Sequence, residues 1–123
     1  MAKLIHGELS YKIIGVLFRV FNKLGYGYQE KYYQRAVALE LNEEKLNYIR
    51  EKEVKLNYRD EIIGKYFLDF IVDNKIILEL KVVNFFHEQD IKQILSYLKA
   101  SGLKLGILAI ITKDGIKYKR IAN

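Results

Sequence analysis

Two dense apolar segments constrain the fold of this chain more than any other feature of its sequence. Residues 62–72 and 76–83 are rich in β-branched and aromatic side chains, and only Asp73-Asn74-Lys75 separates them. Apolar runs of this length, bounded by turn residues, are typical of strands that are buried on both faces of a sheet. We therefore expect two central antiparallel strands, joined by a short turn, in a sheet that is covered on both sides.

The other elements follow from helical or alternating periodicity in the flanking sequence. Helices are predicted over residues 11–24 with Ser10 as N-cap, 29–45 and 87–100, and further strands around 54–58, over 105–112 and over 116–121. The order is α-α-β-β-β-α-β-β, and the helix between the third and fourth strands makes those two strands parallel. The sequence therefore predicts an α/β fold with a mixed five-stranded sheet and helices on both faces.

Composition limits the classes of protein that the chain can belong to. With 123 residues, half of them hydrophobic, the chain is expected to form one domain over residues 1–123. It has no cysteine, which excludes disulfides, thiolate metal sites and thiol catalysis, and only two histidines. No apolar run approaches the length of a membrane span and no signal-peptide core is present, so we expect a soluble, cytoplasmic protein.

The net charge of +6 is concentrated at one end of the sequence. Residues 99–123 carry a single acidic side chain, Asp114, against six basic ones, namely Lys99, Lys104, Lys113, Lys117, Lys119 and Arg120. A basic end on a nearly neutral body is typical of a footprint for a polyanion. Surface lysines that keep a small protein soluble would explain the charge equally well.

Charged residues interrupt the two central strands at three positions, Asp69, Glu79 and Lys81. Because side chains alternate between the faces of a strand, a three-residue turn at residues 73–75 places Asp69 opposite Glu79, whereas a two-residue turn places it opposite Leu78. Two opposed carboxylates destabilise a sheet unless they share a cation. We predict a turn of odd length, such as the three-residue turn, or a bulge that restores the same pairing, and a site for Mg²⁺ or Mn²⁺, which prefer oxygen ligands.

Lys81 would lie beside that ion, where it could orient or deprotonate a water molecule or neutralise charge at phosphorus. This combination favours metal-assisted hydrolysis of phosphodiesters. The alternative is a structural ion pair of Lys81 with Glu79 or Asp69, which is ordinary on half-exposed sheets.

Asp69 followed by Glu79-x-Lys81 resembles the signature of the PD-(D/E)XK nuclease superfamily. Upstream, residues 27–33 match the G-x-x-E-x-x-Y motif of one small bacterial and archaeal family placed in that superfamily, the GxxExxY family. Downstream, a glutamine and a tyrosine four residues apart resemble the Q-x3-Y element of its exonuclease-like branch. The resemblance extends over about residues 8–123 and implies a restriction-endonuclease-like, three-layer fold.

The resemblance also implies a role for each matching residue. Asp69 and Glu79 would bind the metal, assisted by Glu30 and the backbone carbonyl of Leu80, and Lys81 would be the catalytic lysine. The residues implied to hold the site or the substrate are Gln93 and Tyr97, and those expected to contact backbone phosphates are Lys117, Lys119 and Arg120.

We therefore expect a divalent-metal-dependent nuclease that acts on DNA, with RNA as an alternative substrate. Cutting both strands of a duplex would make a homodimer useful. Two other interpretations stay open at this point. The chain could be a nucleic-acid-binding or regulatory module that keeps the fold with little activity, or a protein-interaction subunit that uses a sheet edge or its first helix.

Overall fold

All five strands of the chain form one sheet with the order β1-β2-β3-β4-β5. The computed structural model describes residues 4–123. The elements are α1 (Gly7–Leu24), α2 (Glu30–Glu43), β1 (Tyr48–Tyr58), β2 (Glu61–Val72), β3 (Ile76–Lys81), α3 (Glu88–Ser101), β4 (Leu105–Thr112) and β5 (Gly115–Ala122). This order and the mixed sheet confirm the predicted α/β fold.

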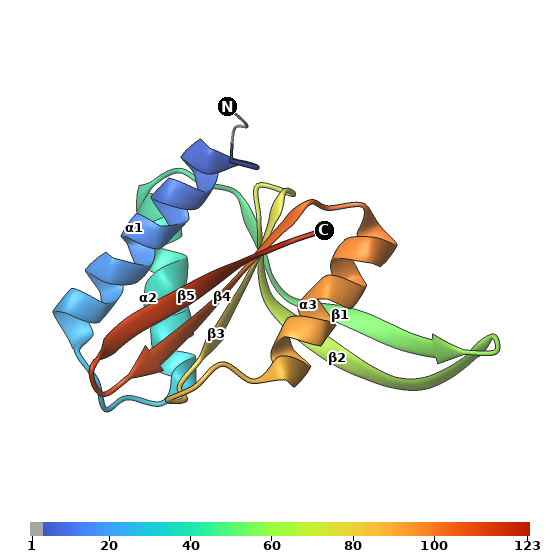
Figure 1. Ribbon diagram of the computed structural model, residues 1–123. Coiled ribbons are helices and arrows are strands. Elements are labelled where there is room, and N and C mark those ends of the chain that lie inside the picture. The colour runs from blue at the N-terminus through green and yellow to red at the C-terminus, as the bar shows by residue number, and fades with distance from the viewer. Residues whose placement is uncertain (1–3) are drawn as a thin grey trace.

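The sheet combines two antiparallel parts with one parallel pair. β1, β2 and β3 form an antiparallel meander, β3 and β4 are parallel across the α3 crossover, and β5 returns antiparallel to β4. Helices α1 and α2 lie together on one side of the sheet, whereas α3 lies on the other (Figure 1). Within residues 4–123, no helix is long and apolar enough to span a membrane.

Each face of the sheet buries its own apolar cluster. Tyr33 of α2 packs with Phe70 and Leu78 beneath α1 and α2, and all three are fully buried. On the opposite face, Ile94 of α3 packs against Ile77. Because burying one such side chain contributes about 1.5–3 kcal/mol, both helical layers are held firmly to the strands that carry Asp69 and Glu79.

A glycine sets the distance between α3 and the sheet. A Cβ atom added at Gly106 of β4 would lie 2.4 Å from Cγ2 of Ile94, which is closer than two carbon atoms can approach. The missing side chain therefore lets α3 lie close over the strand. This close packing fixes the position of the α3 side chains that face the carboxylates.

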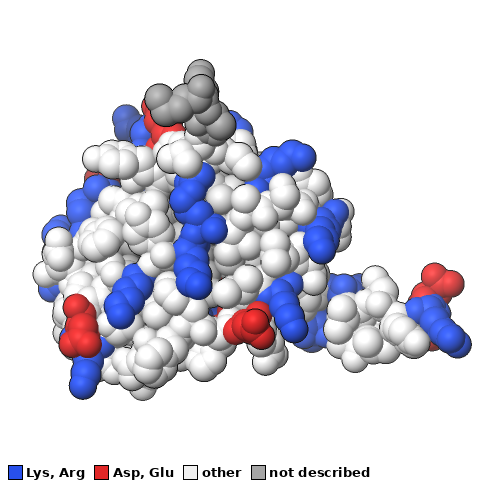
Figure 2. All heavy atoms as spheres, in the orientation of Figure 1, with Lys and Arg blue, Asp and Glu red and all other residues white. Residues whose placement is uncertain are grey.

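β2 leaves the sheet partway along its length. It pairs with β3 only at residues 70–72, but it pairs with β1 over nearly its whole length. Beyond the β3 pairing, the two strands project from the body as a ribbon, residues 52–67, which we call the arm (Figure 1). Its apolar side chains are widely exposed, and Tyr58 and Ile62 are 61% and 59% exposed. Figure 2 shows uncharged residues along the arm and charges of both signs at its tip.

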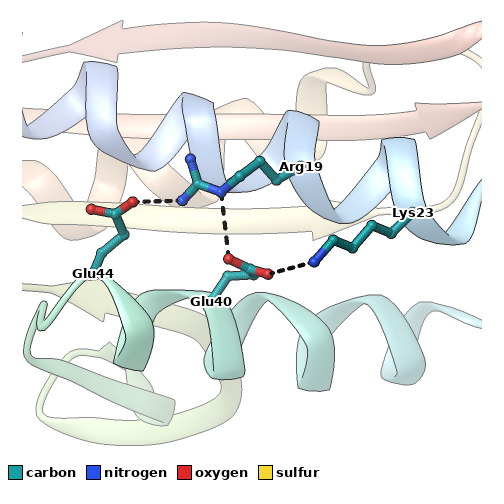
Figure 3. A network of polar contacts seen from close by, with 4 residues as sticks. All are labelled: Arg19, Lys23, Glu40 and Glu44. Carbon is teal, nitrogen blue, oxygen red and sulfur yellow. Dashed lines mark hydrogen bonds and ion pairs between the residues drawn. The ribbon is translucent and has the colours of Figure 1, made fainter.

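Ion pairs join the two helices that share a face. Arg19 of α1 contacts Glu44 through Nη2 at 2.7 Å and Glu40 through Nε at 3.4 Å, and Lys23 Nζ lies 3.9 Å from Glu40 (Figure 3). Such exposed pairs contribute only about 0–1 kcal/mol each, so the buried cluster supplies most of the stability. The ion pairs link specific residues of the two helices. They therefore help to set the orientation of α2, whose first residue is Glu30.

The start of the first helix differs from the prediction. α1 begins at Gly7, and Ser10 is buried inside the helix instead of capping it. The Ser10 hydroxyl donates to the carbonyl of Gly7 at 3.1 Å and accepts from Nη1 of Arg120 at 2.5 Å. The prediction of an N-cap was wrong because the partner of this serine comes from β5, more than a hundred residues away in the sequence.

Candidate active site

The turn between β2 and β3 has the predicted length. Asp73 and Asn74 both adopt left-handed backbone conformations, with φ of 54°, and the amide of Lys75 donates to the carbonyl of Val72 at 3.0 Å. The strands pair Phe70 with Leu78, Ile71 with Ile77 and Val72 with Ile76. This register directs Asp69 and Glu79 toward each other, as the three-residue turn predicts.

The two carboxylates connect the strands where the backbone pairing stops. The amide of Asp69 donates to Oε1 of Glu79 at 2.7 Å, and the amide of Leu80 donates to Oδ2 of Asp69 at 2.8 Å. Side chains therefore take the hydrogen bonds that the next backbone pair of a regular ladder would make. The sequence prediction that Asp69 and Glu79 meet is confirmed.

Burial of these carboxylates opposes their ionisation. Glu79 is only 6% exposed, and its burial together with the charge of Asp69 raises its pKa to about 8. Burial also raises the pKa of Asp69, and the charge of Glu30 adds to this, although the Leu80 amide and Lys81 act in the opposite direction. When both carboxylates are ionised, their protein surroundings do not neutralise the negative charge, which favours a bound cation.

Lys81 lies two residues beyond Glu79 on the same face of β3 and is half-buried. Burial alone would lower the pKa of Lys81, but the charges of Glu79, Glu30 and Asp69 outweigh it and raise that pKa. The side chain is therefore a stable ammonium. The ion pairs within residues 4–123 do not include Lys81, so the alternative of a closed structural ion pair is not what the structure forms.

Glu30 reaches the end of β3 from the first turn of α2. Its Oε1 accepts a hydrogen bond from the amide of Val82, at 3.2 Å. Tyr33, on the following turn, donates its hydroxyl to the carbonyl of Gly25 at 2.5 Å and accepts from the amide of Tyr28 at 3.4 Å. The tyrosine thus fixes the connection between α1 and α2, and this fixed connection places the glutamate.

The donor set matches the preferences of a hard divalent cation. Within residues 4–123 there is no cluster of three or more His, Cys, Asp or Glu side chains suited to a metal. Mg²⁺, however, is usually held by one or two carboxylates and keeps several water molecules. The pair formed by Asp69 and Glu79 fits that requirement. The contributions of Glu30 and of the Leu80 carbonyl stay predictions.

Three residues that the sequence analysis did not select complete the surroundings of the carboxylates. Gln34, one turn after Glu30, provides a side-chain hydrogen bond that lowers the pKa of Asp69. The charge of Asp90 of α3 contributes to raising the pKa of both Glu79 and Lys81. Spacing could have found both, because Gln34 follows Glu30 by four residues and Asp90 precedes Gln93 by three.

Tyr66 of β2 is the third such residue. Its pKa is raised by burial and then by the nearby Tyr97 and Glu79. Alternation along β2 could not have shown this, because the strand changes face at Asp69: Leu68 packs beneath α3, whereas Phe70 packs beneath α1 and α2.

The predicted α3 residues lie on the same side of the sheet as Glu79. Tyr97 is half-buried, packs into the apolar cluster beneath α3 and lies near Tyr66. Gln93 is half-buried and lines a cleft between α3 and the arm. Both positions agree with a role beside the carboxylates, and that role stays a prediction.

The basic residues of β5 separate into two groups. Lys119 of β5 pairs with Leu108 of β4, which in turn pairs with Glu79 of β3. Lys117 lies two residues away on the same face of β5, in the row of paired residues that contains Lys81. Both lysines are exposed and share the face that carries the carboxylates. Lys119 also lies 5.0 Å above the ring of Phe86. Figure 2 shows Lys and Arg side chains along the middle of the side on which β5 is foremost, with few acidic ones among them.

Arg120 points to the other face of the sheet. Its guanidinium donates to the hydroxyl of Ser10 and, at 2.7 Å, to the carbonyl of Ile5. The structure therefore places this predicted phosphate contact against the start of α1, away from Lys117 and Lys119.

Comparison with known proteins identifies the family. The family model described as PD-(D/E)XK nuclease superfamily matches residues 7–120. This chain therefore belongs to the PD-(D/E)XK nuclease superfamily. The solved structures include the crystal structure of SSO0001, which is similar in fold with a TM-score of 0.53 and 18% sequence identity, over 94% of this chain and 78% of that one. None of the curated proteins matches.

Proposed function

We propose that this protein is a divalent-metal-dependent nuclease that hydrolyses phosphodiester bonds in DNA, with RNA as the alternative substrate. The observation that carries the proposal is the buried pair formed by Asp69 and Glu79, beside the cationic Lys81. Membership of the nuclease superfamily supports the same reaction class. A purely structural pair of acids would be difficult to explain, because each raises the cost of ionising the other.

Each residue of the site would have its own role in hydrolysis. Asp69 and Glu79 would hold Mg²⁺ or Mn²⁺ together with the carbonyl of Leu80, and Glu30 would bind it directly or through water. When bound, such a cation would polarise the scissile phosphate and lower the pKa of a coordinated water molecule. The ammonium of Lys81 would orient that water and stabilise the negative charge that develops on the phosphoryl oxygens. Water attacks phosphorus and releases one proton to solvent, the bond to the leaving oxygen breaks, and that oxygen takes up a proton in turn.

We also propose that the chain belongs to the GxxExxY family. Its motif residues have separate structural tasks that support this assignment. Glu30 contacts the end of β3, whereas Tyr33 holds the loop that begins at Gly25.

Nucleic acid as the substrate agrees with the expected cytoplasmic location. A homodimer, which would bring two such sites together, is part of the proposal, and size-exclusion chromatography tests it.

The test is a cleavage assay with end-labelled single-stranded, duplex and branched DNA and with RNA. We expect cutting with Mg²⁺ or Mn²⁺, none with excess EDTA, and a loss of at least about 100-fold for Glu79→Gln and Lys81→Ala. The matched controls are Glu53→Gln and Lys55→Ala, which alter exposed residues of the arm. Absence of cutting with every metal, or equal cutting by the site variants, would refute the proposal. Salt-sensitive binding without cutting would instead support a nucleic-acid-binding module.

A further inference from the structure

A cleft of about 420 Å³ lies between the arm and α3. Leu56 and Tyr66 form its wall on the arm, and Gln89, Gln93 and Ser96 are prominent on its helical wall. The volume is in the range of small-ligand sites in proteins. We call it the arm–helix cleft.

The cleft adjoins the carboxylates. Tyr66 lines it, packs with Tyr97 in the apolar cluster beneath α3, and lies on the face of the sheet that carries Glu79. Gln93 lies one turn after Asp90, whose charge reaches Glu79 and Lys81. A strand whose phosphate lies at Asp69 and Glu79 would therefore have its neighbouring nucleotide at the mouth of this cleft.

The chemistry of the walls suits a nucleobase better than a phosphate. One wall is apolar and partly aromatic, which matches the flat face of a base, because stacking on tyrosine tolerates every base. The other offers the amides of Gln89 and Gln93 and the hydroxyl of Ser96, which can both donate to and accept from a base edge. The two charged side chains of the lining, Lys92 and Glu88, have opposite signs, so the cleft has no net attraction for an anion.

We propose that the arm–helix cleft binds one unpaired nucleobase next to the scissile phosphate, with the base stacked on Tyr66. This inference rests on the proposed nuclease function and specifies its substrate. A base in a duplex is stacked on both sides and paired along its edge, so it cannot enter without leaving the helix. The protein therefore prefers single-stranded or locally unpaired nucleic acid.

The first experiment measures binding without cutting. The protein is mixed, in Ca²⁺, with short single strands that carry 2-aminopurine at one position, and this position is scanned along the strand. We expect a change in 2-aminopurine fluorescence at one or two adjacent positions, retained by Tyr66→Phe and lost in Tyr66→Ala. Tyr58→Ala is the control, because Tyr58 is exposed on the arm and does not line the cleft.

The second experiment measures cutting in Mg²⁺ of strands that carry a single abasic site. For the wild type, we expect cutting at the phosphate beside the missing base to be about tenfold slower than cutting of the intact strand. For Tyr66→Ala, the strand with the abasic site should be cut no more slowly than the intact strand. Ser96→Trp alters an exposed residue and fills the cleft, so it should also abolish the effect of the abasic site, independently of how well Tyr66→Ala folds.

The outcomes separate this inference from the proposed function. Cutting that is insensitive to abasic sites and to both cleft variants would overturn the inference and leave the nuclease intact. A 2-aminopurine response that depends on Tyr66, without any cutting, would support the cleft and overturn the nuclease. Equal preference for fully paired duplex and single strands would also count against the cleft.

Discussion

Asp69 and Glu79 each accept a backbone hydrogen bond from the strand that carries the other, at 2.8 Å for Asp69 and 2.7 Å for Glu79. This exchange holds two acids together without neutralising either. The arrangement is electrostatically costly to the protein alone and becomes favourable when a cation is added.

The first prediction concerns the pH dependence of stability in EDTA. Glu79 has a folded-state pKa of about 8 against an ordinary 4.5, so the folded state binds a proton that the unfolded state has released. The stability contributed by this proton is complete below about pH 4.5 and is lost as pH rises to about 8. We expect unfolding free energy to fall by a few kcal/mol over that interval, as measured by urea titration.

Two comparisons check that the effect comes from the carboxylates. Glu79→Gln should flatten the pH dependence and should be more stable than the wild type at the alkaline end, while Glu53→Gln should behave as the wild type. Mg²⁺ or Mn²⁺ should restore much of the lost stability at high pH. A wild-type protein whose stability rises through this interval would contradict the prediction.

The second prediction separates the roles of Lys81 and the acids. Lys81→Gln should reduce cutting by about 100-fold or more, because the ammonium no longer faces the phosphoryl oxygens. Its affinity for Mn²⁺, measured by calorimetry, should stay the same or rise by up to about tenfold, because a neighbouring positive charge is gone. A loss of Mn²⁺ affinity as large as that of Glu79→Gln would show that Lys81 mainly organises the metal site.

The third prediction distinguishes the two groups of basic residues on β5. Lys117→Ala and Lys119→Ala should each weaken binding to nucleic acid and lower the slope of log K against log salt concentration by about one. Arg120→Ala should leave that slope unchanged and cost about 1–3 kcal/mol of stability, because Ser10 loses a buried partner. An Arg120 variant that is fully stable but binds weakly would reverse this assignment.

The fourth prediction concerns the packing of α3. Gly106→Ala should destabilise the protein by about 1–3 kcal/mol, because the new methyl group would overlap Ile94. Gly64→Ala is the control, because a Cβ there meets no atom within 4 Å, and it should change stability by less than about 0.5 kcal/mol. Denaturant unfolding of both variants measures the difference, and equal stability would show that α3 moves away without cost.

Much of the fold could be predicted because local patterns and packing agree. The apolar runs on both sides of residues 73–75 specified two central strands, and the two-residue period of a strand then linked turn length to the position of Asp69. The parallel pairing of β3 with β4 followed from the helix between them. In each case, the pattern of residues that are close together in the sequence was sufficient to predict the element or its pairing.

What the sequence did not show depends on contacts between distant segments. Ser10 was predicted as a helix cap, because the sequence around it gives no sign of Arg120. Tyr66 was missed, because a local change of face in β2 reverses the alternation used to place its side chain. Gln34 was missed for another reason: its spacing of four residues from Glu30 could have indicated it, but glutamine in a helix is usually solvated, and the position of Asp69 is what gives it a role.

The row that joins Glu79 through Leu108 to Lys119 sets a fixed separation between the carboxylates and an exposed lysine. Two strand spacings place the backbone of Lys119 about 10 Å from that of Glu79. Lys119 would therefore contact a different phosphate of a bound strand from the one that lies at the carboxylates. Under the proposed nuclease function, oligonucleotides that are too short on the β5 side of the cut to reach Lys119 should lose the lysine contact and be cut less efficiently.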